Sequence, residues 1–261
     1  MPVTDAAGKA RALYDARRTR TPIPPLTDAH PSLGMADGYA VQQELVKLIL
    51  ADGDTVVGHK VGATSAAMQR LIGIDSPDHG PVLTSTIYRD GDTVGLQRFI
   101  QPKVEAEIVF VLGERLAGPG VTVLAARTAI AGAVAGMEIV DSRITDWRIR
   151  LADTVADLAS NGAVATSSQL TPLNGWDPRL VGMTLTRNGE LIDTGAGAAA
   201  LGDPVAAVAW LANTLGESGV ALEPGHLIMT GALHAAVPMS QGDVFRAEFD
   251  RLGPVTIRVG A

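Results

Sequence analysis

Apolar and polar residues alternate most regularly in residues 103–112, which read KVEAEIVFVL. This alternation, rich in β-branched residues, predicts a strand. Side chains on a strand switch faces at each step, so Glu105 and Glu107 lie on one face with Cα atoms roughly 6.5–7 Å apart. Val109 and Val111 continue that face, and the opposite face is apolar throughout.

Helical spacing of apolar residues predicts a small N-terminal helical lobe over residues 1–54. Its first helix covers residues 5–18 with Thr4 as N-cap, and its second covers residues 35–51. Prolines at 22, 24 and 25 separate the two. Further helical segments are predicted at residues 64–73, at residues 123–135, and from Asp203-Pro204 onward, where Asp is a good N-cap and Pro suits the first position.

Strands are predicted over most of the remaining chain, and several follow one another without a helix between them. A doubly wound fold would alternate strand and helix regularly, so we expect a mixed, mostly antiparallel α+β fold with a curled sheet. Residues 55–261 should form one continuous unit, because the linker near residues 52–55 is too short to separate independent domains. The expected elements are strands at 55–62, 137–140, 227–230, 244–249 and 255–259, a loop at 75–81, and a hairpin at 184–194 that turns at Asn188-Gly189.

Three acidic residues are candidates for a metal site: Glu105, Glu107 and Glu138. Glu138 is one acid in the otherwise apolar run 130–140, and buried acids are rare unless they are paired or bind a metal. Carboxylates from two strands suit Mg²⁺ or Mn²⁺, which favour oxygen ligands. Two alternatives stay open: a solvated acidic strand end at Glu105 and Glu107, and a buried salt bridge from Glu138 to Arg143.

A few other polar residues could take part in chemistry. Lys60 lies in a short strand between two glycines, although its side chain could also reach solvent. His79 and His234 could act as acid or base, but no spacing supports a histidine metal site. Small polar residues at 153–162 could bind a carboxylate, or they could cap a helix. No phosphate-binding loop, dinucleotide fingerprint or serine nucleophile elbow is present.

Composition excludes several classes of protein. The 261 residues contain no cysteine, which excludes disulfides and zinc–thiolate sites. A net charge of −7 and 4% aromatic residues argue against nucleic acid as a partner. The basic cluster at 17–20 should occupy the end of a helix, where cations suit the dipole. We expect no apolar run that is long and clean enough to span a membrane, and the N-terminus lacks the order of a signal peptide, so we expect a cytoplasmic protein.

Several segments in order resemble the 2-keto-4-pentenoate hydratase family, which also includes 2-oxohept-4-ene-1,7-dioate hydratases and 4-oxalocrotonate decarboxylases. This family belongs to the fumarylacetoacetate-hydrolase-like superfamily. The resemblance runs from about residue 20 to the end of the chain. The segments that carry it are GHKVGATS at 58–65, GIDSPDHG at 73–80, EAE at 105–107, EIVDSRI at 138–144, DTVAD at 153–157 and MTGALHAAVP at 229–238, with Gly242-Asp243.

The resemblance implies a mixed β-roll, like the C-terminal part of fumarylacetoacetate hydrolase, with a small N-terminal helical lobe. It implies a homo-oligomer, a pentamer or decamer built from five-fold rings. It also implies Mg²⁺ or Mn²⁺ held by Glu105, Glu107 and Glu138, catalytic roles for Lys60 and Asp78, and substrate contact by Ser160. The chain departs from the family at Leu158, where relatives usually carry Asn. Leu158 cannot donate an amide hydrogen bond.

The implied activity is metal-dependent hydration of 2-hydroxypenta-2,4-dienoate (2-oxopent-4-enoate) to 4-hydroxy-2-oxopentanoate, in meta-cleavage degradation of aromatic compounds. In this hypothesis Lys60, its pKa lowered by burial, moves protons, and Asp78 activates the water. The alternative is decarboxylation of 4-oxalocrotonate (2-oxo-3-hexenedioate), which would need a cation, such as Arg143, Arg148 or Arg150, for the second carboxylate. A third possibility is a non-catalytic partner subunit of a pathway enzyme.

Overall fold

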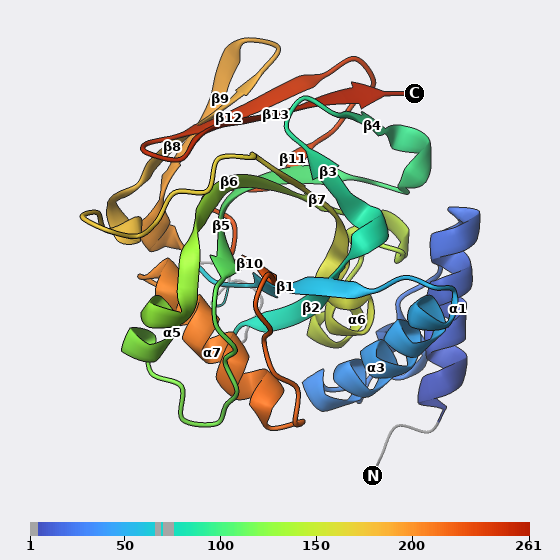
Figure 1. The fold of residues 1–261 in the computed structure, drawn as a ribbon. Coiled ribbons are helices and arrows are strands. Elements are labelled where there is room, and N and C mark those ends of the chain that lie inside the picture. Colours follow the sequence, from blue (N-terminus) through green and yellow to red (C-terminus); the bar gives the residue numbers. More distant parts are fainter. Residues whose placement is uncertain (1–4, 66–68, 70–75) are drawn as a thin grey trace.

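Two β-sheets, flanked by helices, make up the computed structural model of the protein, which describes residues 5–65, 69 and 76–261 (Figure 1). The larger sheet contains β1 (Val56–Gly62), β2 (Asp78–Leu83), β3 (Ile87–Arg89), β5 (Lys103–Leu112), β6 (Ile130–Val140), β7 (Asn161–Thr166), β10 (Leu227–Met229) and β11 (Val237–Pro238). The smaller sheet contains β4 (Thr93–Gly95), β8 (Gly182–Arg187), β9 (Glu190–Ala196), β12 (Val244–Phe249) and β13 (Gly253–Gly260).

Strand pairing confirms the expected mixed, mostly antiparallel α+β fold. The larger sheet runs in the order β2-β1-β10-β5-β6-β7-β3, with β11 paired to β5, and the smaller one runs β4-β13-β12-β8-β9. The pairs β1–β10, β3–β7 and β4–β13 are parallel, and the other pairs are antiparallel. The larger sheet curls until β2 contacts β7, which makes it a roll (Figure 1).

The outer face of the roll forms the main core. Val104, Ala106, Ile108 and Phe110, the face of β5 opposite its glutamates, are completely buried. They belong to one cluster with the inward side chains of β12 and β13 and with helices α5 (Val123–Ala129) and α7 (Pro204–Gly216). Burial of such a large apolar surface is the dominant stabilising contribution to the fold.

The inner face of the roll is apolar over much of its length. Val82, Val109, Val134, Val164 and Met229 come from five different strands and pack together there. By alternation Glu107 shares a face with Val109, and Glu138 shares a face with Val134. The carboxylates therefore adjoin an apolar part of the interior.

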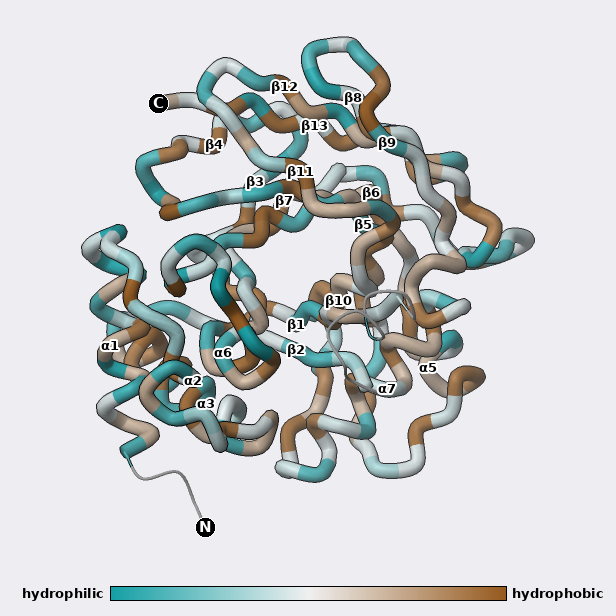
Figure 2. Tube along the Cα trace, turned by 180° about the vertical axis from the view of Figure 1, so that it is seen from behind, coloured by the Kyte–Doolittle hydropathy of each residue, from teal (hydrophilic) through white to brown (hydrophobic). Residues whose placement is uncertain are grey.

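A third packing region involves the N-terminal helices α1 (Ala6–Thr19), α2 (Leu26–Ala29) and α3 (Met35–Ala51), which gather on one side of the roll together with α6 (Leu151–Ala156) (Figure 1). Hydrophilic and hydrophobic segments alternate along α1 and α3, as expected of helices with one buried face (Figure 2). Their buried cluster includes Leu83, Ile144 and Leu158 from the rest of the chain. The division into residues 1–54 and 55–261 stays a prediction.

Most predicted elements appear where the local pattern placed them. Helix α3, strand β5 and strand β12 match the predicted ranges, and Asp203 caps α7 with Pro204 at its first position. Asn188 and Gly189 both adopt the positive φ that the hairpin turn requires. Helix α1 ends in the basic cluster as expected. Its N-cap is Asp5, whereas Thr4 lies outside the described residues.

Three predicted ranges were wrong. The helix expected at 123–135 ends at Ala129, and β6 begins at Ile130 instead of Met137. The run 131–136 is rich in alanine, which favours a helix locally, but pairing with β5 and β7 on both sides imposes the extended conformation. The loop expected at 75–81 is already strand β2 from Asp78, because this segment pairs with β1 despite Pro81. Most of the helical segment predicted at 64–73 lies outside the described residues.

One segment, Gly197–Gly216, is long and apolar enough to cross a membrane by length and composition, contrary to the sequence-based expectation. Half of it is buried inside the protein, and α7, which forms most of it, belongs to the main core. Its hydropathy is therefore that of a core helix.

Candidate metal centre and active site

The register between β5 and β6 brings the three predicted glutamates together. Glu105 lies directly opposite Glu138, and Glu107 lies opposite Gly136, one pair further along the same face. One carboxylate oxygen from each glutamate lies within 4.8 Å of the other two. This spacing allows a single ion to contact all three carboxylates.

Burial makes this cluster costly without a counter-charge. Glu107 and Glu138 are 1% and 0% exposed, so the alternative of a solvated acidic strand end is wrong for Glu107, whereas Glu105 is half-buried. Burial and the nearby Glu138 raise the pKa of Glu105 to about 7. Burial, Glu138 and Glu105 raise the pKa of Glu107 well above its usual range. A divalent cation would remove this repulsion.

The hydrogen bonds of the glutamates leave an oxygen available for a metal. Asn161 Nδ2 donates to Oε1 of Glu138 over 2.9 Å, and the backbone N–H of Gly231 donates to Oε2 of Glu107 over 2.8 Å. Oε2 of Glu138 is buried without a hydrogen-bond partner in the described part of the chain. An all-oxygen donor set in which the buried Oε2 of Glu138 accepts no hydrogen bond from the described residues, with the Lys60 ammonium 3.5 Å away, fits a hard cation such as Mg²⁺ or Mn²⁺.

Lys60 on β1 faces the same cluster and is only 5% exposed, so its side chain does not reach solvent. Its Nζ lies 3.5 Å from Oε2 of Glu138 and donates to the carbonyl of Ala159 over 2.9 Å. Burial lowers the pKa of Lys60, but the carboxylates of Glu138, Asp78 and the two β5 glutamates raise it more. The expected lowering of this pKa is therefore wrong for the protein without a metal.

Asp78 approaches Lys60 across the backbone of Gly62, which pairs with it in the β1–β2 ladder. A Cβ atom added to Gly62 would lie 2.2 Å from Oδ1 of Asp78 and 3.0 Å from Nζ of Lys60. Only glycine leaves room for both groups at this point. Oδ1 of Asp78 is buried without a hydrogen-bond partner in the described regions, and burial raises the pKa of this carboxyl.

The carbonyl that holds Lys60 comes from a left-handed backbone turn. Leu158, Ala159 and Ser160 have φ values of 58°, 52° and 57°. A non-glycine residue in this conformation costs roughly 1–2 kcal/mol, so three in succession store strain at the site. The turn also places Ser160 Oγ 3.0 Å from Thr154 Oγ1, and both side chains line the cavity described below.

Arg143 does not pair with Glu138, so that alternative is wrong. Its Nε donates to Oδ1 of Asp157 over 2.5 Å, and its other nitrogens donate to the backbone carbonyls of Asp157 and Asn161. Asp153 accepts from the backbone and hydroxyl of Thr27. Asp153 and Asp157, the two aspartates of the polar segment 153–162, therefore stabilise the fold. Asn161 in that segment does bind a carboxylate, but the carboxylate is that of Glu138.

The two histidines differ in their position. His79 stacks on Tyr39 with ring centroids 4.5 Å apart and does not line the cavity. His234 lines the cavity, but its Nε2 accepts from the backbone N–H of Ala106 and its Nδ1 lies 2.6 Å from the carbonyl of Ala235. With the proton on Nδ1 both contacts are satisfied, and the pKa of His234 is lowered by burial. The His234 imidazole is therefore neutral and forms part of the cavity wall.

A cavity of about 610 Å³ is lined by Lys60, Asp78, Glu105 and Glu107. Lys103 and Trp147 line it as well, with the Lys103 ammonium 4.3 Å from the centre of the Trp147 ring. Sequence reasoning missed both residues, although Lys103 shares a strand face with Glu105 and Glu107 and was identifiable by that spacing. The other lining side chains are mainly small or apolar: Val61, Ala63, Val140, Ile149, Ala199, Ala232, Leu233, Ala235 and Ala236.

Comparison with known proteins gives consistent results. Residues 50–260 match the family model "Fumarylacetoacetate (FAA) hydrolase C-terminal". A 2-keto-4-pentenoate hydratase of Paraburkholderia xenovorans is 43% identical over 94% of this chain and 91% of its own length. A 2-hydroxyhexa-2,4-dienoate hydratase of Comamonas testosteroni is 40% identical over 96% of each chain.

Among solved structures, a 4-oxalocrotonate decarboxylase from Pseudomonas putida G7, complexed with magnesium and adipate, has a TM-score of 0.96 and 34% identity. The match covers 99% of this chain and 100% of the other. The observed β-roll thus has the architecture that the motifs predicted. The chain belongs to the fumarylacetoacetate hydrolase C-terminal family and, within it, to the group of 2-keto-4-pentenoate hydratases and their decarboxylase relatives.

Proposed function

We propose that this protein is a metal-dependent hydro-lyase that adds water to 2-hydroxypenta-2,4-dienoate, giving 4-hydroxy-2-oxopentanoate, in the meta-cleavage degradation of aromatic compounds. The observation that carries the proposal is the convergence of three carboxylates, two of them fully buried, with Lys60 and Asp78 beside one cavity. Hydratases of this substrate class are similar to the chain over nearly its whole length.

Glu105, Glu107 and Glu138 would hold the metal, with Mg²⁺ or Mn²⁺ as the candidates. When bound, such an ion supplies positive charge that stabilises the anionic form of a 2-oxo acid. The hydrogen bonds from Asn161 and Gly231 orient two of the carboxylates before the ion arrives. Outer contacts of this kind fix the ligand geometry.

Lys60 and Asp78 would share the proton transfers. The Lys60 ammonium, fixed by the Ala159 carbonyl, is suited to stabilise the enolate oxygen and to deliver a proton during ketonisation. The unpartnered oxygen of Asp78 is suited to accept a proton from the water that adds at C4. Its raised pKa makes it a stronger base than an exposed aspartate. Ser160 and Thr154 hydroxyls would contact the substrate.

The cationic side chains of the cavity favour hydration over decarboxylation of a dicarboxylate. Among the described residues, Lys60 and Lys103 are the cations that line it. Arg143 is occupied by Asp157, and Arg148 pairs with Asp28 at the surface. A second carboxylate would thus depend on Lys103, which lies against Trp147. The remaining walls suit a short apolar tail.

The test is an assay of purified protein with 2-hydroxypenta-2,4-dienoate and, separately, with 2-oxo-3-hexenedioate. Hydration predicts loss of diene absorbance without CO₂ release from the first substrate and weak turnover of the second. Rapid CO₂ release from the second would favour the decarboxylase. No turnover of either by the metal-loaded protein would favour a non-catalytic partner subunit.

The ligand assignment has its own test. The Glu107→Gln variant should lose the response of activity to added Mg²⁺ or Mn²⁺ and should bind the ion far more weakly in calorimetry. Glu114→Gln, which lies outside the cavity, is the matched control and should behave like the parent. An unchanged metal affinity in Glu107→Gln would refute the assignment.

A further inference from the structure

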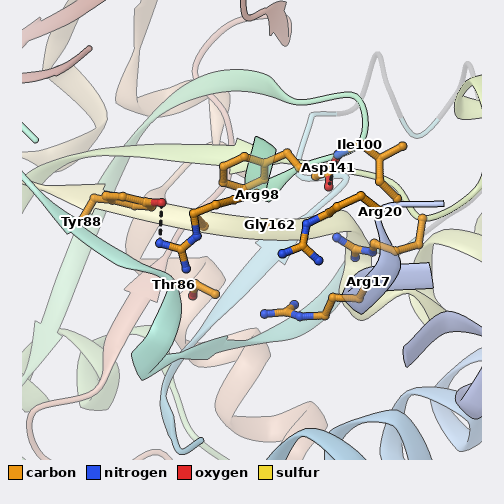
Figure 3. A pocket seen from close by; sticks show the side chains of 11 residues that line it. Arg17, Arg20, Thr86, Tyr88, Arg98, Ile100, Asp141 and Gly162 are labelled. Atoms are coloured by element: carbon orange, nitrogen blue, oxygen red, sulfur yellow. Dashed lines mark hydrogen bonds between the residues drawn. The ribbon is translucent and has the colours of Figure 1, made fainter. Parts of the chain in front are cut away.

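A second, much smaller pocket lies beside the C-terminal end of α1, separate from the catalytic cavity, with which it shares no lining residue. Four arginines line it: Arg17 from the last turn of α1, Arg20 from its C-cap, Arg98 from the short 3-10 helix Leu96–Arg98, and Arg143 after β6. Figure 3 shows the guanidinium groups of Arg17, Arg20 and Arg98 pointing into the same space.

The four arginines differ in whether their guanidinium N–H groups have hydrogen-bond acceptors. Arg143 is held by Asp157 and Asn161, and Arg98 donates to the Tyr88 hydroxyl over 2.8 Å and to the carbonyl of Ser85. Within the described part of the chain, no hydrogen bond or ion pair ties the guanidinium of Arg17 or Arg20 to the protein. These two side chains keep their donor groups free.

The pocket holds little negative charge to balance them. Asp141 is the acid that lines it, among the described residues, and its two oxygens accept the backbone N–H groups of Ile100 and Gln101. Burial, Arg143 and Arg20 lower the pKa of Arg17 to about 10, although Asp54 and Asp157 act in the opposite direction. The like charges thus repel one another, and an anion in the pocket would remove that repulsion.

The helix dipole explains only part of the cluster. Cations near a helix C-terminus are favourable, and this suffices for Arg18, whose guanidinium lies 5.5 Å from the Tyr14 ring and donates to its hydroxyl. It does not account for Arg98, which comes from a different element 78 residues after Arg20 and meets it at the pocket.

The guanidinium fork matches the oxygens of phosphate and similar oxyanions through paired N–H donors. The pocket volume of about 50 Å³ has space for one such group and is far below the 610 Å³ of the catalytic cavity. We propose that this pocket is a binding site for a small tetrahedral oxyanion, either inorganic phosphate or the phosphate group of a small metabolite, held chiefly by Arg17, Arg20 and Arg98.

The experiment titrates inorganic phosphate into the full chain, freed of metal so that phosphate cannot bind through an ion in the catalytic cavity. Calorimetry and thermal unfolding are compared with chloride at equal ionic strength. We expect one phosphate per chain and a rise in Tm with phosphate beyond that with chloride. A parallel titration uses glycerol phosphate, a phosphate ester. Binding of this ester would mean that the pocket can accept the phosphate group of a metabolite, whereas binding of inorganic phosphate alone would mean that the pocket accepts only the free ion.

Matched variants locate the binding. Arg20→Gln, at an exposed position, should weaken phosphate binding by about tenfold or more, because one charge-assisted contact is lost. Arg20→Lys keeps the charge, removes the fork and should give an intermediate loss. Arg18→Gln removes the same charge from the same helix end outside this pocket and should bind like the parent.

Absence of phosphate binding beyond chloride in the parent protein would overturn the proposal, and so would equal losses in Arg18→Gln and Arg20→Gln. A third contrary result is a change of molecular mass in solution for Arg20→Gln together with no phosphate binding in the parent. That result would assign the pocket to an acidic side chain of a second copy instead.

Discussion

The acidic cluster inside the roll and the arginine pocket beside α1 both gather charges of one sign, but they are built differently. The glutamates lie on two paired strands whose register sets their separation, and their inner face continues into packed valines. The arginines come from a helix end, a 3-10 helix and a loop, and they meet through long flexible side chains.

This difference has a consequence for energy and for selectivity. Paired strands hold the carboxylates close together even without a metal ion. The repulsion between them, together with burial, raises the pKa values of Glu105 and Glu107. In the arginine pocket Arg143 is fixed by Asp157, but Arg20 is exposed, so its long side chain can move and solvent screens its charge. The acidic site is therefore suited to bind a divalent ion in a fixed geometry, and the arginine pocket is suited to a weaker, exchangeable anion.

The largest effect is expected from removing the cation that faces the acidic cluster. Lys60→Met should lower kcat by about 10²–10⁴-fold, because a positioned proton donor is lost, while Mg²⁺ binding persists. Lys103→Met is the matched control and should retain most of the activity toward 2-hydroxypenta-2,4-dienoate. Steady-state kinetics and metal titration measure both. A Lys60→Met variant with parental kcat would end the proposed role of this residue.

The second effect concerns the buried ion pair between Asp157 and Arg143, the latter of which lines the arginine pocket. Asp157→Asn should lower the free energy of unfolding by about 3–5 kcal/mol, because Arg143 would remain buried without its counter-charge. The control is Asp177→Asn, whose partner Arg179 is exposed, and its effect on stability should be much smaller because solvent screens this pair. Urea denaturation compares the two. Equal losses would mean that burial does not distinguish these pairs.

The third effect is a pH dependence specific to the acidic cluster. The pKa of Glu105 in the folded protein is about 7, above its value of 4.5 in an unfolded chain. The folded state therefore binds more protons between these values, and its stability without metal should fall as pH rises from about 4.5 to 7, by on the order of 2 kcal/mol. Saturating Mg²⁺ should oppose this loss, because it binds the deprotonated carboxylates.

Unfolding curves at several pH values, with and without Mg²⁺, measure this window. The Glu105→Gln variant, which cannot titrate, should show a shallower slope in the absence of metal. Stability that rises between pH 4.5 and 7 in the metal-free protein would contradict the assigned repulsion.

The smallest effect tests the left-handed turn that carries the Ala159 carbonyl. Leu158→Asn loses a fully buried apolar side chain but gains a residue that tolerates positive φ. The two contributions oppose each other, and we expect a net loss of about 1–2 kcal/mol with little change in kcat. Leu45→Asn, in the same cluster but on helix α3, should cost more. If the two variants lose equal stability, the turn is not strained at Leu158.

Local sequence patterns predicted the elements whose residues contact mainly their own neighbours in the chain. The alternation of β5, the helical spacing of α3, the Asn188-Gly189 turn and the Asp203-Pro204 cap each follow from short-range geometry. The shared face of Glu105 and Glu107 followed from the strand period alone, and the unusual acid in an apolar run identified Glu138.

Only the tertiary structure decided what meets across the sheet. Register placed Glu138 opposite Glu105, pairing with β1 turned the expected loop at Asp78 into a strand, and pairing on both sides extended β6 through a run of residues that favour a helix. The tertiary structure also decided that Asp157 is the partner of Arg143 and that the four arginines meet at one pocket. Sequence period specifies which way a side chain points, whereas long-range pairing specifies which residue it faces, and that depends on the free energy of the whole fold.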